Sequence, residues 1–122
     1  IMMFDNIWCP GRSRVVEIDP KDNAIVWQYA GTPQQPFYSL TCSMVQYLPN
    51  GDRMVTSSDE GRAFTIGATG KLTWEFLNPH RAGPNDAFIA TLFQCERLPK
   101  DFPTHWATPP ANARAAKTAS LL

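Results

Sequence analysis

The chain has few of the residues that build metal centres. It contains two histidines and three cysteines among 122 residues. Cys9, Cys42 and Cys95 show no CxxC spacing, and His80 and His105 lie far from any cysteine in sequence. We therefore expect no metal site. The cysteines are expected to be single buried or free thiols, with one disulfide and a leftover thiol as the alternative in an exported protein.

Long apolar runs and an excess of one charge are also lacking. No run approaches the roughly 18 apolar residues of a membrane span, so no membrane span is expected. With 11 basic and 11 acidic residues, the chain has no net charge and a pI near 6.9. A nucleic-acid partner, which would need a basic stripe, is not expected. No signal peptide is present, and the apolar start at Ile1 favours a piece of a longer polypeptide.

A strand-turn-strand pattern occurs twice, in residues 13–29 and 61–76. Arg14 and Arg62 are 48 residues apart, and Trp27 and Trp74 are 47 residues apart. A period in this range, with one hairpin and one tryptophan per copy, is typical of β-propeller blades. A partial third copy is indicated because Leu48-Pro49-Asn50-Gly51 recurs as Leu98-Pro99-Lys100-Asp101.

We therefore predict an all-β fold of antiparallel four-stranded propeller blades. Residues 1–98 are expected to hold about two and a half blades of a propeller, and residues 99–122 a proline- and alanine-rich tail. Propellers close with roughly four to eight blades. The expected partners are thus the remainder of the propeller or further copies of the chain, which would cover the open blade faces.

One complete blade is predicted between Ser39 and Leu77, with an Asn50-Gly51 hairpin turn between its first two strands. A strand at residues 1–4 is expected to end in a turn at Asp5-Asn6, followed by a loop over residues 7–13. Trp27 and Trp74 are predicted to be buried between blades. The other predicted core residues are Val16, Ile18, Val26, Val55, Phe64 and Ile66.

Several segments together resemble the arylsulfotransferase family. They are Phe4-Asp5-Asn6, Ser13 to Asp19, Ile25 to Tyr29, Phe37-Tyr38-Ser39, Leu48 to Gly51 and Gly61 to Phe76, in the family's order. The resemblance covers roughly residues 1–98 and implies the C-terminal part of a six-bladed propeller. It also implies a secreted or periplasmic protein that transfers a sulfuryl group between phenols through a sulfated histidine, without a cofactor.

No residue here matches the family's nucleophile, which would lie upstream of Ile1. This chain alone is therefore expected to lack catalysis. Sulfuryl transfer also needs cations aimed at the sulfonate oxygens. Arg14 and Arg62 are candidates for that contact, but their equivalent places in the repeat favour structural pairing between strands.

The remaining site candidates lie on connections between blades. Phe37 and Tyr38 could line a pocket for a phenolic small molecule, although packing within a blade is the commoner role. His80 and Arg81 are weak catalytic candidates on a loop, where a solvated histidine is the commoner case. His105, in the proline-rich tail, is weaker still.

A second resemblance concerns residues 68–76, which are similar to the tryptophan-docking repeat of quinoprotein propellers. There the tryptophan locks one blade to the next, and the repeat also occurs in propellers that are not enzymes. This implies a structural role for Trp27 and Trp74. A non-catalytic propeller segment that binds proteins or acts as a scaffold is therefore the alternative function.

Overall fold

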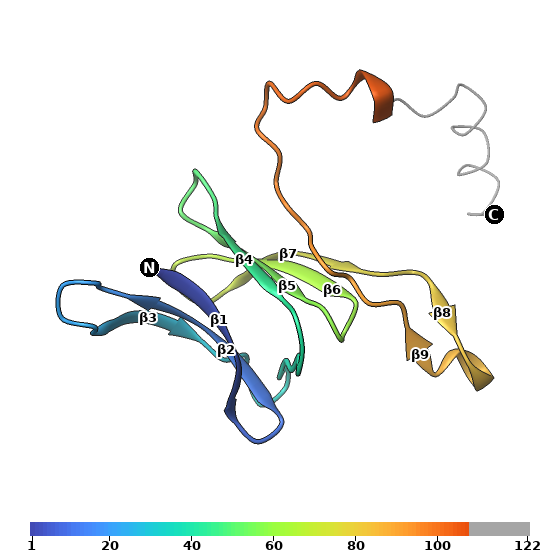
Figure 1. Ribbon diagram of the computed structural model, residues 1–122, viewed down its shortest axis with the longest axis horizontal. Helices are drawn as coiled ribbons and strands as arrows, with labels where there is room; N and C mark the ends of the chain where they lie inside the picture. Colours follow the sequence, from blue (N-terminus) through green and yellow to red (C-terminus); the bar gives the residue numbers. More distant parts are fainter. Residues whose placement is uncertain (108–122) are drawn as a thin grey trace.

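The computed structural model describes residues 1–107, and this part of the chain is all-β (Figure 1). Three antiparallel sheets follow one another along the chain. The first contains β1 (Met2–Cys9), β2 (Arg12–Ile18) and β3 (Ile25–Tyr29). The second contains β4 (Met44–Tyr47), β5 (Arg53–Ser57), β6 (Arg62–Ile66) and β7 (Leu72–Leu77). The third is the short hairpin β8 (Arg81–Ala82) and β9 (Phe88–Ile89).

Two 3-10 turns, η1 (Pro84–Asp86) and η2 (His105–Ala107), complete the described elements. The alanine-rich end of the predicted tail lies outside the described residues. The four-stranded sheet confirms the predicted strand order between Ser39 and Leu77, with the Asn50-Gly51 turn joining β4 to β5. Gly51 has a φ of +86°, which this turn requires and which glycine adopts without strain.

The repeat seen in the sequence is also a repeat in strand register. Glu17 pairs with Trp27 across β2 and β3, and Thr65 pairs with Trp74 across β6 and β7. The register then shifts at the next residue of each pair, after Glu17 in one copy and after Thr65 in the other. A β-bulge at the same place in both hairpins shows that the copies share a backbone conformation, and not only a composition.

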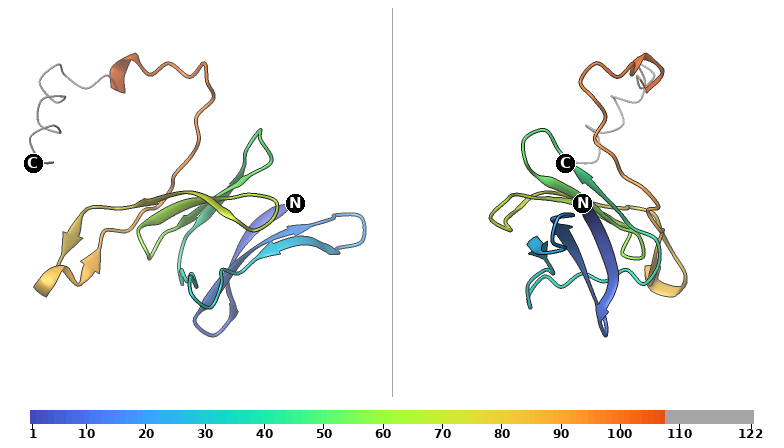
Figure 2. Two further views of the ribbon diagram at one scale, coloured as in Figure 1. Left: turned by 180° about the vertical axis from the view of Figure 1, so that it is seen from behind. Right: turned by 60° about the vertical axis from the view of Figure 1, so that its left-hand side comes forward.

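The first two sheets pack face to face around aromatic side chains (Figure 2). Phe37, from the connection between the sheets, lies 5.7 Å from Phe4 and 5.5 Å from Phe64 between ring centroids, edge to face in both cases. Tyr29 stacks on Phe37 at 5.7 Å. Val15, Val55 and Ile66 fill the remaining space and are fully buried. This cluster is the main core of the described residues.

The first hairpin differs from the prediction. Asp5 and Asn6 lie inside β1 and form no turn, because the chain turns later, at Pro10-Gly11. Gly11 takes the positive φ of +71° there. The predicted loop over residues 7–13 is therefore mostly strand.

Burial matches the prediction at Val16, Val55, Phe64 and Ile66. The prediction was wrong for two other residues: Val26 is 63% exposed and Trp74 is 46% exposed. Val26 lies at the β-bulge of β3, which is an edge strand with no further strand beside it among residues 1–107. Trp74 lies on the face of the second sheet that points away from the first. Ile18 and Trp27 are half-buried.

The face of the second sheet that points away from the first sheet is covered in part by the chain after β9. Leu92 and Cys95 pack on Leu48, Met54 and Ala63 in a smaller apolar cluster. Figure 1 shows this segment returning across the second sheet after the β8–β9 hairpin. The half of the face that carries Trp74 and Phe76 stays exposed.

Candidate functional site

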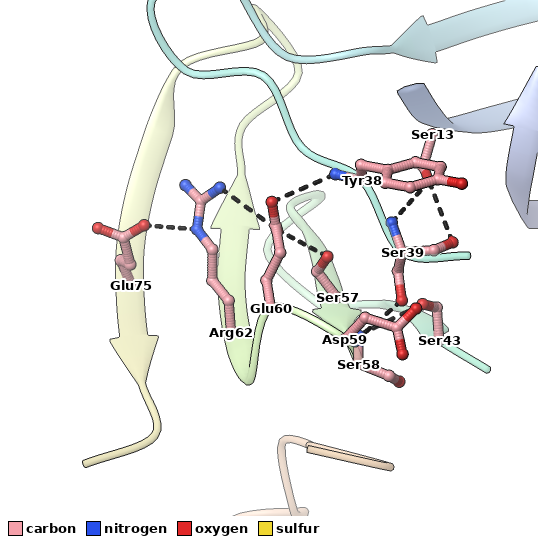
Figure 3. A network of polar contacts seen from close by, with 10 residues as sticks. All are labelled: Ser13, Tyr38, Ser39, Ser43, Ser57, Ser58, Asp59, Glu60, Arg62 and Glu75. Atoms are coloured by element: carbon pink, nitrogen blue, oxygen red, sulfur yellow. Dashed lines mark hydrogen bonds and ion pairs between the residues drawn. The ribbon is translucent and has the colours of Figure 1, made fainter. Parts of the chain in front are cut away.

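A polar cluster surrounds the turn between β5 and β6, and it contains two of the predicted site residues, Tyr38 and Arg62 (Figure 3). Glu60 is at its centre. The Glu60 carboxylate accepts hydrogen bonds from Ser57 Oγ at 2.8 Å and from the Tyr38 backbone N–H at 3.2 Å. Arg62 approaches the same carboxylate at 4.0 Å. Glu60 therefore ties the inter-sheet connection to the second sheet.

Serines of the cluster extend it to the first sheet. Ser13 Oγ donates to the carbonyl of Asn6 at 2.7 Å and accepts from the Ser39 backbone N–H at 3.0 Å. Ser39 Oγ in turn accepts from the Asp59 backbone N–H at 3.0 Å. Ser13 and Ser39 are fully buried. Their hydroxyls satisfy backbone groups that would be costly to leave unpaired at a sheet junction.

Asp59 anchors the connection at its far end. Its carboxylate accepts from the backbone N–H of Thr41 at 3.0 Å and from Thr41 Oγ at 2.9 Å. These hydrogen bonds, the backbone one first, stabilise the ionised form and lower the pKa of Asp59 below its usual value. Ser58 Oγ, beside Asp59, is buried and has no hydrogen-bond partner among the described residues.

Arg14 and Arg62, the two candidate sulfonate contacts, are both engaged within their own sheets. Arg14 Nε donates to Asp5 at 2.8 Å, and Arg62 Nε donates to Glu75 at 2.6 Å. Each pair joins neighbouring strands, although Arg14 reaches back to β1 and Arg62 forward to β7. Each guanidinium therefore has a carboxylate partner within its own sheet.

The other candidates are spread over the chain. Phe37 lies in the aromatic core, while the half-buried Tyr38 contributes its backbone N–H to the polar cluster. His80 is exposed, and its backbone N–H donates to Asn78 Oδ1 at 3.1 Å. Arg81 in β8 and His105 in η2 are exposed as well. The structure therefore does not bring the histidine and arginine candidates to one site.

A contact that the sequence did not predict joins the two sheets. Arg53 of β5 forms two hydrogen bonds to Glu17 of β2, at 3.0 and 2.7 Å. Its guanidinium also lies 4.4 Å from the centroid of the Trp27 ring. The hydrogen bonds to Glu17 raise the pKa of Arg53 above its ordinary value. The available signal was an arginine at the first position of a strand, directly before the apolar Met54 and Val55.

Trp27 completes this contact. Its indole Nε1–H donates to the carbonyl of Ala68 at 3.2 Å, in the β6–β7 turn. The tryptophan of the first copy thus lies on the hairpin of the second. We name Glu17, Trp27, Arg53 and Ala68 the inter-sheet lock.

A groove of about 610 Å³ lies between the β4–β5 hairpin and residues 97–100. Tyr47, Leu48 and Leu98 form its apolar wall, and Arg97 and Lys100 are its charged residues. None of the predicted site residues lines it. Its walls come from Leu48-Pro49 and Leu98-Pro99, the same motif in two copies of the repeat.

All three cysteines and both histidines of the chain lie within the described residues. Cys9, Cys42 and Cys95 are all free, so the disulfide alternative does not hold in this structure. Burial raises the pKa of the Cys95 thiol. Within residues 1–107, no group of three or more His, Cys, Asp or Glu side chains is placed to hold a metal ion. No helix in this part of the chain has the length and apolar character to cross a membrane.

In comparisons with known proteins, no protein-family model, curated protein or solved structure matches the chain.

Proposed function

We propose that this chain forms consecutive blades of an arylsulfotransferase-like β-propeller and that its own role there is structural. The observation that carries the proposal is the inter-sheet lock, in which Trp27 of one copy of the repeat docks on the hairpin of the next. Propellers are built from such neighbouring contacts between repeated four-stranded sheets. The order of the family-like segments supports the choice of family.

In this proposal, the sulfuryl-carrying histidine is provided by a strand outside these 122 residues. The internal pairing of Arg14 with Asp5 and of Arg62 with Glu75 supports a structural role for both arginines. An arginine that contacts a sulfonate in the transition state needs free N–H donors aimed at its oxygens. The polar cluster around Glu60 then serves to hold the connection between blades.

The test is a sulfuryl-transfer assay on the protein isolated from its source, with 4-nitrophenyl sulfate as donor and phenol as acceptor. We expect release of 4-nitrophenolate that depends on phenol, and a histidine carrying one added sulfuryl group in the donor-treated protein. The 122-residue chain alone should release none. Turnover by that chain, abolished by His80→Ala, would contradict the structural role.

A scaffold propeller without catalysis is the second candidate. The observation that favours it is that the arginine candidates are paired and the histidine candidates lie apart. An isolated protein that folds but neither releases 4-nitrophenolate nor becomes sulfated would support this alternative against the enzyme.

A further inference from the structure

The groove beside the β4–β5 hairpin has two walls that are fixed to each other. Residues 46–50 form one wall and residues 97–100 form the other, and we name it the Leu-Pro groove after the motif in both walls. Gln46 Nε2 donates to the carbonyl of Arg97 at 3.1 Å, and Gln46 Oε1 accepts from the Arg97 backbone N–H at 2.8 Å. One side-chain amide thus holds both backbone groups of Arg97. The groove therefore has a set width before any ligand enters, which lowers the cost of binding.

Tight turns close both walls of the Leu-Pro groove. The Leu48 N–H donates to the carbonyl of Asp52 at 2.8 Å, and the Phe102 N–H donates to the carbonyl of Pro99 at 3.1 Å. Leu48 is itself buried in the smaller apolar cluster of the second sheet. The groove is thus supported from below by packed side chains and at its ends by hydrogen-bonded turns.

The groove leaves large apolar side chains uncovered. Tyr47 is 58% exposed and Leu98 is 44% exposed. The Tyr47 ring is held from one side by the Arg53 guanidinium, which lies 5.2 Å from the ring centroid and is itself bound to Glu17. The volume of about 610 Å³ lies within the range of about 300–1,000 Å³ that is typical of small-molecule sites. A flat apolar molecule of two or three rings would cover these side chains.

The charges in the groove have one sign. Arg97 and Lys100 line it, and no carboxylate does. Among residues 1–107, neither cation forms an ion pair. Glu96 and Asp101 are their neighbours in sequence but are not lining residues, and the Glu96 carboxylate accepts from Gln94 Nε2 at 2.6 Å. An anion bound between the two cations would relieve their mutual repulsion.

We propose that the Leu-Pro groove binds an aromatic carboxylate. Its rings lie against Tyr47 and Leu98, and its carboxylate lies between Arg97 and Lys100. A planar carboxylate can accept two N–H groups from a guanidinium, and an ammonium group adds a point charge. This inference goes beyond the proposed function, which gives these residues no ligand, and it does not depend on sulfuryl transfer.

The first experiment titrates the intact protein with 2-naphthoate and follows binding by calorimetry. We expect saturable binding of one molecule per groove, weakened by added salt because the cations are exposed. The matched ligand is 2-naphthamide, which has the same shape and no charge. It should bind about tenfold more weakly, since it forms no ion pair with the two cations.

The second experiment removes the cations. Arg97→Ala together with Lys100→Ala should weaken 2-naphthoate binding about tenfold and leave 2-naphthamide binding unchanged. The backbone of Arg97 stays held by Gln46, so the groove keeps its width. The matched control is Lys21→Ala together with Arg81→Ala, which removes the same charge at exposed positions outside the groove. It should leave the binding of both ligands unchanged.

The third experiment shortens the apolar wall. Leu98→Ala should weaken both ligands by a similar factor, about fivefold, because their rings lose the same apolar contact. The matched control is Leu40→Ala, since Leu40 is 52% exposed and lies outside the groove. Each substituted side chain is exposed, so the circular dichroism spectrum should not change in any variant.

Failure of 2-naphthoate to saturate a site would overturn the proposal. Equal affinity for 2-naphthoate and 2-naphthamide would overturn the role of the cations, and equal losses in a variant and its matched control would overturn the position of the site. Because 2-naphthoate has neither a sulfuryl group nor a hydroxyl group, it reports on the groove alone. Binding to a source protein that transfers no sulfuryl group would contradict the enzyme proposal, and transfer without binding would contradict this inference.

Discussion

Arg53 connects the two packed sheets through a single guanidinium group. Arg53 is 7% exposed, and both of its hydrogen bonds to Glu17 are charge-assisted. Arg53→Ala should lower the free energy of unfolding by about 2–3 kcal/mol, because it leaves the Glu17 carboxylate partly buried without a partner. Denaturant unfolding measures this loss.

Arg14 is the matched control for that prediction. It also pairs with a carboxylate at 2.8 Å, but both side chains are more exposed, at 24% and 31%. Solvent screens this pair, so Arg14→Ala should cost about 1 kcal/mol or less. Equal losses for the two variants would contradict the role assigned to Arg53.

The Asp59 carboxylate makes stability depend on pH in the acid range. Its pKa is lower in the folded protein than the value of 3.8 for a free side chain, chiefly because the Thr41 backbone N–H bonds to it. The contribution is therefore complete above that value and is lost as the pH falls through the folded pKa. Asp59→Asn should flatten the fall in unfolding free energy below about pH 4. An unchanged acid profile would contradict this assignment.

The turn between β5 and β6 depends on a glycine for space as well as for conformation. Gly61 has a φ of +55°, and a Cβ added there would lie 2.5 Å from the carbonyl oxygen of Ala90. Gly61→Ala should therefore cost about 2–4 kcal/mol and detach the segment that crosses the turn. Hydrogen exchange at the Leu92 amide, which donates to Ser58, reports the detachment directly.

Gly70 separates the cost of a positive φ from the cost of the steric clash. Its φ is +80°, but no atom lies within 4 Å of an added Cβ. Gly70→Ala should cost only the left-handed conformation, about 1 kcal/mol. A Gly61→Ala loss no larger than this would show that the crossing segment yields without cost.

The amino-acid sequence alone determined the local architecture of this protein. The period of 47 to 48 residues, the Asn50-Gly51 turn and the alternating apolar strands predicted antiparallel sheets and one complete four-stranded set, and the structure confirms these. They could be predicted because hairpin turns and strand alternation depend on residues close together in the chain. The turn at Asp5-Asn6 was wrong because the later Pro10-Gly11 pair is the stronger turn former.

Only the tertiary structure decided which of two equivalent tryptophans is covered. Trp27 and Trp74 occupy equivalent places in the repeat, but among residues 1–107 only Trp27 has a following four-stranded sheet to dock on. The pairing of Arg53 with Glu17 was decided in the same way. Such contacts join residues up to 36 positions apart, as Glu17 and Arg53 are. They depend on how the sheets stack, which no local pattern in the sequence specifies.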